Sequence, residues 1–437
     1  MEAHDVPLTG RLIDSLGQWG LADYGIVLLT ALVVNLTGYI FIVAVARLLG
    51  PSDFSALAAL LALATIVVTG ICGPLQTIIA RYISADTSRG LDDNARYLVR
   101  RAFLAMTAAG VGIALVVIAT SWPIKSWLGI STLPPVLLLA LYIGSSFVFP
   151  VTAGAVQGLQ KFVVYGVALS AGAIVLVSLG IALVAAGLKV NGAMAAEVIS
   201  MLVTVAILGV WVKRWLGKRK ARGSMDLTHL KRFAPAVVVA STCMTAFIYI
   251  DVFLVRGLIG GTHAGYYAGA QKLGTLVCLV AGVFAIVLFP RVSANHARGV
   301  TSWGMLARVE AAAAVLCGAT AVLLAVFPGW FMRFAFGGKY VPGVALVPIF
   351  ALAMFFYSLQ SICVTFLLGV DRFGFIFILG PGIILETVLI VLFHRSTTTV
   401  AWIVTFVSMG VAALVGTYVL VSWLADRRRG ASNALAA

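Results

Sequence analysis

Long apolar segments dominate this chain and place it in a membrane. A helix needs about 20 mostly apolar residues to cross a bilayer, and twelve such stretches follow one another here. With 62% hydrophobic and only 10% charged residues, the 437-residue chain has too few charges to cover a water-soluble surface. We therefore predict an all-α polytopic membrane protein and exclude secreted, disordered, fibrous and nucleic-acid-binding classes. The predicted spans are 24–46, 54–80, 102–121, 134–157, 163–187, 193–212, 234–255, 265–290, 308–331, 342–368, 373–393 and 400–424.

The 30 Lys and Arg residues are unevenly distributed among the loops. If both termini are inside, 22 of these cations lie in inner segments and 7 in outer loops, while Lys272 falls inside a predicted helix. Inner loops of membrane proteins carry the excess of Lys and Arg. We therefore predict cytoplasmic termini and interpret most of the net charge of +15 as an orientation signal.

A basic hydrophilic segment, KRWLGKRKARGSMDLTHLKR, separates six predicted helices from six. Two halves of a transporter need such a linker to move against each other. The predicted organisation is a tail or interfacial helix, a six-helix lobe, the linker, a second six-helix lobe and a cytoplasmic tail, at residues 1–23, 24–212, 213–233, 234–424 and 425–437.

An internal repeat supports this division. Gly50 and Gly260 stand 210 residues apart in similar sequences, and so do Arg81 and Arg291. The segment GLQKF, which begins at residue 158, returns as GVDRF 211 residues later. A register held over more than 100 residues indicates duplication. Because six helices are an even number, both copies have the same orientation, and the repeat is parallel.

Catalytic and metal-binding signatures are missing from the sequence. It has no phosphate-binding loop, no HExxH and no convincing nucleophile elbow, and its predicted outer loops are short. The five cysteines lie in apolar stretches without CxxC pairs or nearby histidines. We expect no enzyme activity, no catalytic residues, no cofactor and no metal site.

Ionisable residues at membrane depth are the candidate functional groups, since each costs roughly 2.5–3.5 kcal/mol at a helix centre. Asp251 in the seventh predicted helix and Lys272 in the eighth lie at similar depth. They form either a structural ion pair or a cavity-lining pair that binds substrate or a coupling ion. Glu386, in the eleventh predicted helix, is either a protonatable group or a structural hydrogen-bonding residue. Asn35, Gln76 and Gln271 either line a cavity or join helices.

Arg47 and Arg256 end the first and seventh predicted helices on the outer side. They either extend to the interface as anchors or converge on an anionic headgroup, because the guanidinium fork suits phosphate. Arg81 and Arg291 at the inner ends are either anchors or part of a phosphate gate. The sequence leaves these alternatives open.

Several motifs resemble the polysaccharide transporter family, the Wzx-like oligosaccharide flippases of the MOP superfamily. They are ARLLGPSDFSALAALLALATIVVTG with ARYISA, AGAVQGLQKF, and YIDVFLVRGLIGGTHAGYYAGAQKL with VLFPRVSA. The likeness covers most of residues 24–395. One departure is Ser55, which stands where the family often has Gly, whereas Gly265 keeps the Gly in the second copy.

The resemblance implies two six-helix lobes around a central cavity that works by alternating access. It implies transfer of polyprenyl-diphosphate-linked oligosaccharide from the inner to the outer leaflet of the bacterial inner membrane, for a cell-surface or exopolysaccharide. Lys272, Arg47 and Arg256 are then candidates for a cationic cavity that meets the diphosphate, and Asp251 or Glu386 for ion coupling.

Other functions remain open at this stage. One is a cation-coupled exporter of small organic compounds, as in multidrug-type relatives; another is a non-transporting membrane partner of a glycan synthase complex. The expected partners are the lipid-linked oligosaccharide and the bilayer, with H⁺, Na⁺ and polysaccharide polymerase or assembly proteins as open alternatives. No nucleic-acid partner is expected.

Overall fold

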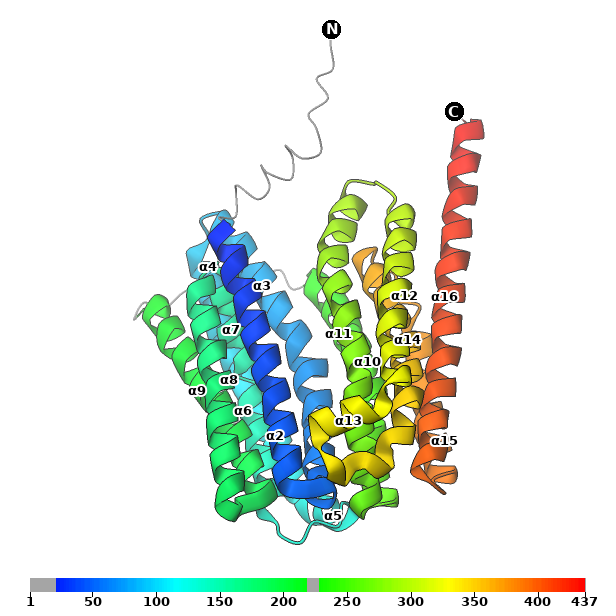
Figure 1. The fold of residues 1–437 in the computed structure, drawn as a ribbon. Helices are drawn as coiled ribbons and strands as arrows, with labels where there is room; N and C mark the ends of the chain where they lie inside the picture. The colour runs from blue at the N-terminus through cyan, green and yellow to red at the C-terminus, as the bar shows by residue number, and fades with distance from the viewer. Residues whose placement is uncertain (1–20, 218–227, 437) are drawn as a thin grey trace. The chain divides into compact units, whose positions relative to one another are not determined.

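The computed structural model describes residues 21–217 and 228–436 (Figure 1). Most of the predicted N-terminal tail and the middle of the predicted linker therefore lie outside the described residues. Packing divides the chain into two compact units. Unit 1 contains residues 1–45, 75–119 and 134–227, and unit 2 contains residues 46–74, 120–133 and 228–437.

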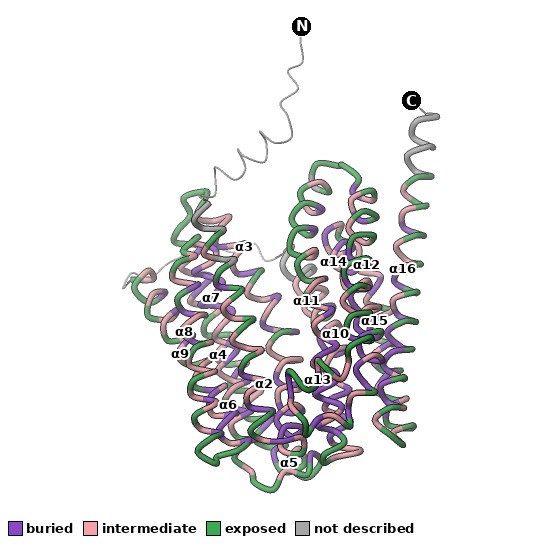
Figure 2. The backbone as a smooth tube through the Cα atoms, in the orientation of Figure 1, coloured by how far each residue is buried: buried purple, intermediate pink, exposed green. Residues whose placement is uncertain are grey.

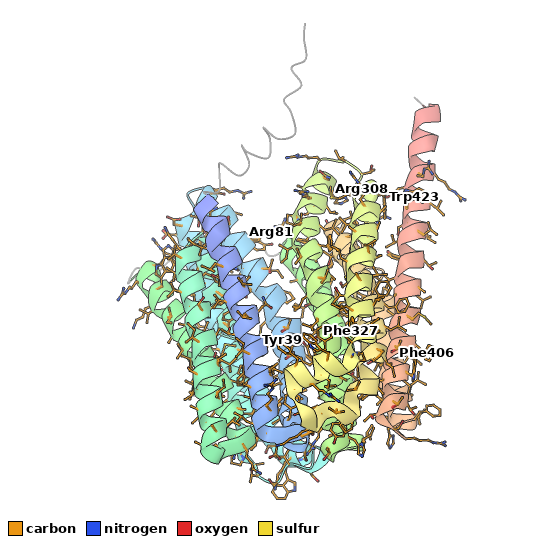
Figure 3. The ribbon with its side chains drawn as sticks, in the orientation of Figure 1. Tyr39, Arg81, Arg308, Phe327, Phe406 and Trp423 are labelled. Carbon is orange, nitrogen blue, oxygen red and sulfur yellow. The ribbon has the colours of Figure 1, made fainter. Side chains whose placement is uncertain are left out.

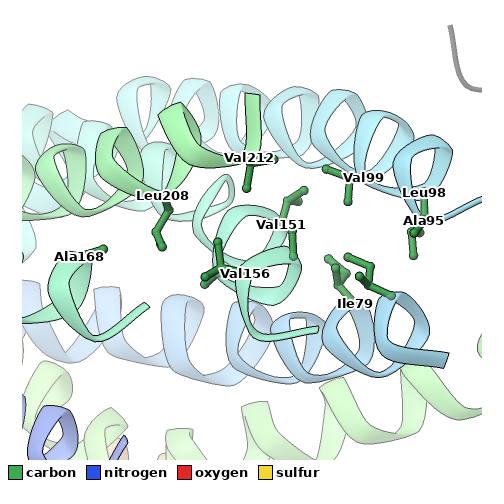
Figure 4. Packing of buried hydrophobic residues seen from close by; sticks show 12 residues of the cluster. Ile79, Ala95, Leu98, Val99, Val151, Val156, Ala168, Leu208 and Val212 are labelled. Carbon is green, nitrogen blue, oxygen red and sulfur yellow. The ribbon is translucent and has the colours of Figure 1, made fainter. Parts of the chain in front are cut away.

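Unit 1 is a bundle whose core lies between α3, α4, α7, α8 and α9. Ile79, Val99, Val156 and Leu208 belong to one buried apolar cluster (Figure 4). Small residues bring α8 and α9 close together, and Ser200 Oγ donates a hydrogen bond to the Gly172 carbonyl at 2.8 Å. Its helices are α2 (Leu21–Val67, which continues into unit 2), α3 (Gly73–Ser88), α4 (Asp92–Ala119), α6 (Pro134–Ser146), α7 (Phe149–Gly158), α8 (Phe162–Leu183) and α9 (Lys189–Leu216).

Unit 2 is built around α14, against which α11, α12 and α16 pack. Buried positions are frequent along α14, whereas α16 carries many exposed ones (Figure 2). The helices are α5 (Ser121–Trp127), α10 (Thr228–Leu258), α11 (Gly261–Ala297), α12 (Trp303–Val326), α13 (Pro328–Phe336), α14 (Val347–Gly369), α15 (Ile376–Leu392) and α16 (Thr397–Ala436). Unit 2 also contains a 3₁₀ segment at Gly338–Leu346 and a π-helical turn at Val68–Cys72, and unit 1 contains a π-helical turn at Val184–Leu188.

The described residues contain nine helical stretches long and apolar enough to cross a membrane, and α15 is a shorter apolar helix. Two of these stretches, Leu29–Ser88 and Phe162–Leu216, each contain two predicted spans. A straight 60-residue helix would be about 90 Å long, three times the apolar layer. Gly50 and Gly187 interrupt them with positive φ angles of 74° and 90°. The polytopic helical fold is confirmed.

Apolar side chains also cover much of the outside, as expected for a surface in contact with lipid. Phe377 is 84% exposed and Ile286 is 76% exposed. Arg308 and Trp423 lie at the end of unit 2 where α16 ends, whereas Phe406 lies nearer the start of α16 (Figure 3). Basic and aromatic groups at helix ends are typical of membrane–water interfaces.

The repeat extends to the backbone conformation. Gly50 (φ 74°, ψ 170°) and Gly260 (φ 70°, ψ −179°) share one left-handed geometry 210 residues apart. Gln160 and Asp371, at the third positions of GLQKF and GVDRF, have φ angles of 58° and 55°. Non-glycine residues rarely adopt positive φ. Its recurrence at the same repeat position shows that the two copies of each motif share a local backbone conformation.

Candidate substrate and ion site

The candidate site lies in unit 2, on the hairpin of α10 and α11. Positive φ angles at Gly260 and Gly261 allow the tight turn between these helices. Asp251 lies seven residues before the end of α10, about 10 Å along the helix axis. Lys272 lies eleven residues into α11, about 16 Å along its axis. Both groups therefore occupy the apolar depth of the hairpin.

Asp251 is completely buried. Its Oδ2 accepts a hydrogen bond of 2.7 Å from the Tyr267 hydroxyl, while no described residue forms a hydrogen bond with its Oδ1. Tyr267 is also fully buried, and its ring meets the Phe350 ring edge-on at 4.8 Å. This packing fixes the hydroxyl toward α10. Asp251 thus has one satisfied oxygen and one that is available to another ligand.

Glu386 on α15 is the second buried carboxyl of the site. It is completely buried, and neither carboxyl oxygen has a hydrogen-bond partner in the described part of the chain. One turn earlier, Gly382 leaves room for close packing, since a Cβ there would lie 2.8 Å from the Phe247 ring. This contact brings α15 against α10, so that Asp251 and Glu386 interact electrostatically. Ionised carboxylates are costly to bury without a counter-charge, and the described residues form no ion pair with either group. Uptake of a proton or a cation would relieve this cost.

Lys272 is half-buried, and its ammonium lies over the Tyr249 ring, 5.8 Å from the centroid. A cation gains modest stabilisation from an aromatic face. The structure gives this ammonium no ion pair with Asp251, whose hydrogen bond comes from Tyr267. Among the residues that the structure describes, no carboxylate forms an ion pair with the Lys272 ammonium.

Arg47 and Arg256 lie at helix ends and not beside Lys272 at mid-helix. Arg256 is buried and donates hydrogen bonds to the Leu128 carbonyl and to Ser55 Oγ, each at 2.8 Å. Arg47 is exposed and donates to the Ala335 carbonyl at 2.9 Å. The acceptors of both guanidiniums belong to this chain. The three cations are thus not gathered into one cluster in unit 2.

The predicted polar side chains divide by role. Gln271 donates to the Ile248 carbonyl at 2.6 Å and so joins α11 to α10. Gln76 donates to Gln157 Oε1 at 2.9 Å within unit 1. Asn35 is exposed and donates to a carbonyl of its own helix. Arg81 and Arg291 are exposed.

Two polar contacts escaped the sequence reasoning. Tyr267 stands 16 residues after Asp251, and the two residues lie at similar distances from the turn at Gly260. This spacing could have predicted the contact between them. Glu310 accepts a hydrogen bond of 2.9 Å from Cys363 Sγ across α12 and α14. Nothing in the sequence links those two positions, 53 residues apart. Within the described ranges, no three His, Cys, Asp or Glu side chains gather as metal ligands.

The fold is similar to that of solved structures described as members of the MOP superfamily. A structure described as an inward-facing conformation of a multidrug resistance MATE family transporter of that superfamily matches with a TM-score of 0.70 and 14% identity, over 90% of this chain and 96% of the other. The lipid II flippase MurJ, in an inward closed conformation, matches with a TM-score of 0.64 and 13% identity, over 90% and 86%. A MOP superfamily transporter from Pyrococcus furiosus matches at 0.60 and 16%, over 90% and 92%. These identities show the fold alone.

The family follows from the sequence match. Residues 21–296, more than half of the chain, match the family described as Polysaccharide biosynthesis protein, and the chain belongs to that family. No curated protein matches it. The resemblance of the motifs to a polysaccharide family is thereby confirmed. The chain is a multi-pass membrane protein whose fold is similar to that of solved transporters and flippases.

Proposed function

We propose that this protein flips a polyprenyl-diphosphate-linked oligosaccharide from the inner to the outer leaflet by alternating access, for a cell-surface or exopolysaccharide. Membership of the polysaccharide biosynthesis family and the fold shared with a lipid II flippase support this substrate class. The observation that carries the proposal is Lys272, a cation at mid-helix for which residues 21–217 and 228–436 supply no ion pair. A lone ammonium at membrane depth requires an anion or water.

The diphosphate of such a lipid is the anion that fits Lys272. An ammonium has three donors and approaches phosphate oxygens as a point charge on a flexible stem. Charge-assisted hydrogen bonds of this kind are about twice as strong as neutral ones. The Tyr249 ring holds the ammonium without neutralising it, so the charge remains available to a headgroup.

Arg47 and Arg256 can bind the diphosphate only after their present hydrogen bonds to this chain break. Each guanidinium holds carbonyl oxygens of this chain at the predicted outer side. We therefore assign the first contact with the diphosphate to Lys272 and any contact of the two arginines to a later stage.

The carboxyl pair of Asp251 and Glu386 is the proposed coupling site for H⁺ or Na⁺. Three of its four oxygens have no hydrogen-bond partner although they are buried. Proton binding neutralises such a pair directly, and Na⁺ binding does so through the free oxygens. Transport driven by an ion gradient then follows from the charge state of these two residues.

A second candidate function is cation-coupled export of small organic compounds. The buried acidic pair favours it, because carboxylates attract organic cations, and one structure with this fold is described as a multidrug resistance transporter. The unpaired Lys272 argues against it, since a cation repels such a substrate. A non-transporting partner of a glycan synthase or polymerase complex is the third alternative.

The wider assignments are proposals of the same kind. We place the protein in the bacterial inner membrane with both termini in the cytoplasm, on the distribution of Lys and Arg. Residues 24–212 and 234–424 are the proposed moving lobes, joined by the basic linker.

Binding of a polyprenyl diphosphate to the purified protein in nanodiscs tests the substrate class. We expect Lys272→Ala to weaken binding about tenfold or more, because one charge-assisted contact is worth about 1.5–3 kcal/mol. Lys339→Ala, which removes an exposed lysine, is the matched control. Equal affinities of the two variants, or tighter binding of an organic cation than of the diphosphate lipid, would move the assignment to the exporter.

A further inference from the structure

We propose that Arg47 and Arg256 are two reciprocal latches of a gate at the predicted outer end of the helices. Each arginine ends the first helix of its own half and binds the end of a short helix from the other half. The inference rests on the proposed alternating access, since a gate must open and close in turn. In this proposal, the two arginines stabilise the closed state of the gate.

The Arg256 latch joins the end of α10 to first-half segments within unit 2. Its Nε donates to the Leu128 carbonyl at 2.8 Å, and one terminal nitrogen reaches the Gly129 carbonyl at 3.4 Å. Both carbonyls follow directly after α5, where a helix leaves its last acceptors unpaired and negatively polarised. The other terminal nitrogen donates to Ser55 Oγ at 2.8 Å and to the Ser52 carbonyl at 3.3 Å.

The Arg47 latch repeats this contact with the halves exchanged. Its Nε donates to the Ala335 carbonyl at 2.9 Å, and a terminal nitrogen donates to the Phe334 carbonyl. These acceptors close the last turn of α13, which occupies in the second half the place that α5 occupies in the first. The donors are 209 residues apart and the acceptor pairs 206 apart, close to the repeat offset of 210. The same interaction is thus made twice.

Between the latches, first-half and second-half residues form a tight seal. The buried Phe54 ring packs against Phe336 and Tyr340 with centroid distances of 5.9 and 6.0 Å. The Tyr340 hydroxyl donates to the Ala46 carbonyl at 2.9 Å. A Cβ on Gly265 would lie only 2.0 Å from the Pro51 carbonyl oxygen, so the two backbones touch at this point.

This arrangement explains why residues 46–74 and 120–133 belong to the packing unit of the second half. An arginine fork suits the latch because it holds several carbonyls from two segments at once, and a lysine does not. Every hydrogen-bond acceptor of the two guanidiniums is a neutral oxygen, and Arg256 is also attracted by Asp53. Opening therefore breaks hydrogen bonds to oxygens that water can satisfy. The contact is therefore strong enough to close the gate and weak enough to be released.

A buried cysteine reporter tests the latch. Ala264, beside Gly265 in the first turn of α11, is 3% exposed, and Ala264→Cys adds one small thiol there. Its labelling by a polar thiol reagent is followed on the purified full-length protein in nanodiscs, without substrate, with the protein lacking this cysteine as the blank. We expect Arg256→Gln and Arg47→Gln each to raise the labelling rate about tenfold, the effect of about 1.4 kcal/mol on a two-state gate. Arg333→Gln, an exposed arginine on α13, is the matched control and leaves the rate unchanged.

The outcomes separate the latch from other roles. Arg256→Lys keeps the charge and loses the fork, so labelling as fast as in Arg256→Gln supports the latch. If Arg256→Gln and Arg47→Gln both label at the same rate as Arg333→Gln, the latch proposal is overturned. Because Arg47 is exposed, Arg47→Gln keeps the test decisive if the Arg256 variants do not fold. The labelling readout needs no substrate. If the arginine variants label faster but the protein flips no lipid in liposomes, the proposed substrate is refuted and the proposed gate is retained.

Discussion

Gly265→Ala is the perturbation whose cost the structure defines most sharply. The added Cβ would lie 2.0, 2.5 and 2.7 Å from the O, C and Cα atoms of Pro51. All three are backbone atoms, so no side-chain rotation relieves the overlap. Overpacking typically costs 1–3 kcal/mol, and a contact this short belongs at the upper end, about 3 kcal/mol. The gain in helix propensity from Gly to Ala returns only about 0.5–1 kcal/mol.

The matched control is Gly282→Ala in the same helix, where a Cβ meets nothing within 4 Å. We expect Gly282→Ala to unfold at the wild-type temperature or slightly above it. Gly265→Ala either lowers the unfolding temperature in nanodiscs or relieves the overlap by opening the gate. About 3 kcal/mol shifts a two-state gate by more than a hundredfold, which the rate of thiol labelling at Ala264→Cys reports. If Gly265→Ala matches Gly282→Ala in both unfolding temperature and labelling, the close contact with Pro51 does not exist.

Three further predictions concern the buried and inner polar groups. Tyr267→Phe removes the 2.7 Å hydrogen bond to the buried Asp251, and we expect about 1–3 kcal/mol lower stability in denaturant titrations; no change would show that Asp251 does not rely on it. Glu386→Gln fixes a neutral side chain, so leaflet exchange should persist and lose its response to an imposed H⁺ or Na⁺ gradient; a retained response would remove Glu386 from coupling. Asp426→Asn breaks the 2.6 Å ion pair with Arg372, and because both side chains are partly exposed, the unfolding temperature should fall by only a few degrees; a fall beyond 10 °C would contradict that weak coupling.

The sequence predicted those parts of the fold that repeat or alternate along the chain. Apolar length predicted the spans, and the 210-residue offset paired Gly50 with Gly260, which have similar backbone angles. The pattern could not show where a helix is bent and where it ends. Leu29–Ser88 is one helical stretch in which Gly50 changes direction and separates two spans.

The candidate site was harder to predict because helix rotation about the axis is not encoded in hydropathy. Asp251 and Lys272 both lie within the apolar length of the hairpin, but about 10 Å and about 16 Å along their helices. Asp251 is hydrogen-bonded to Tyr267, and Lys272 lies over Tyr249. The acceptors of Arg47 are carbonyls 287 and 288 residues away, and backbone acceptors carry no residue-type signal. Only three-dimensional packing reveals them.

Leaflet exchange in liposomes tests the central claim most directly. The protein is reconstituted with a labelled polyprenyl-diphosphate oligosaccharide, and a membrane-impermeant reagent reports the label exposed on the outer leaflet. We expect exchange well above that of empty liposomes for the wild type and for Lys339→Ala, and loss of exchange in Lys272→Ala at equal reconstitution. No exchange above empty liposomes, across several lipid-linked glycans and with an imposed ion gradient, would contradict a flippase with a cation at Lys272 in its pathway.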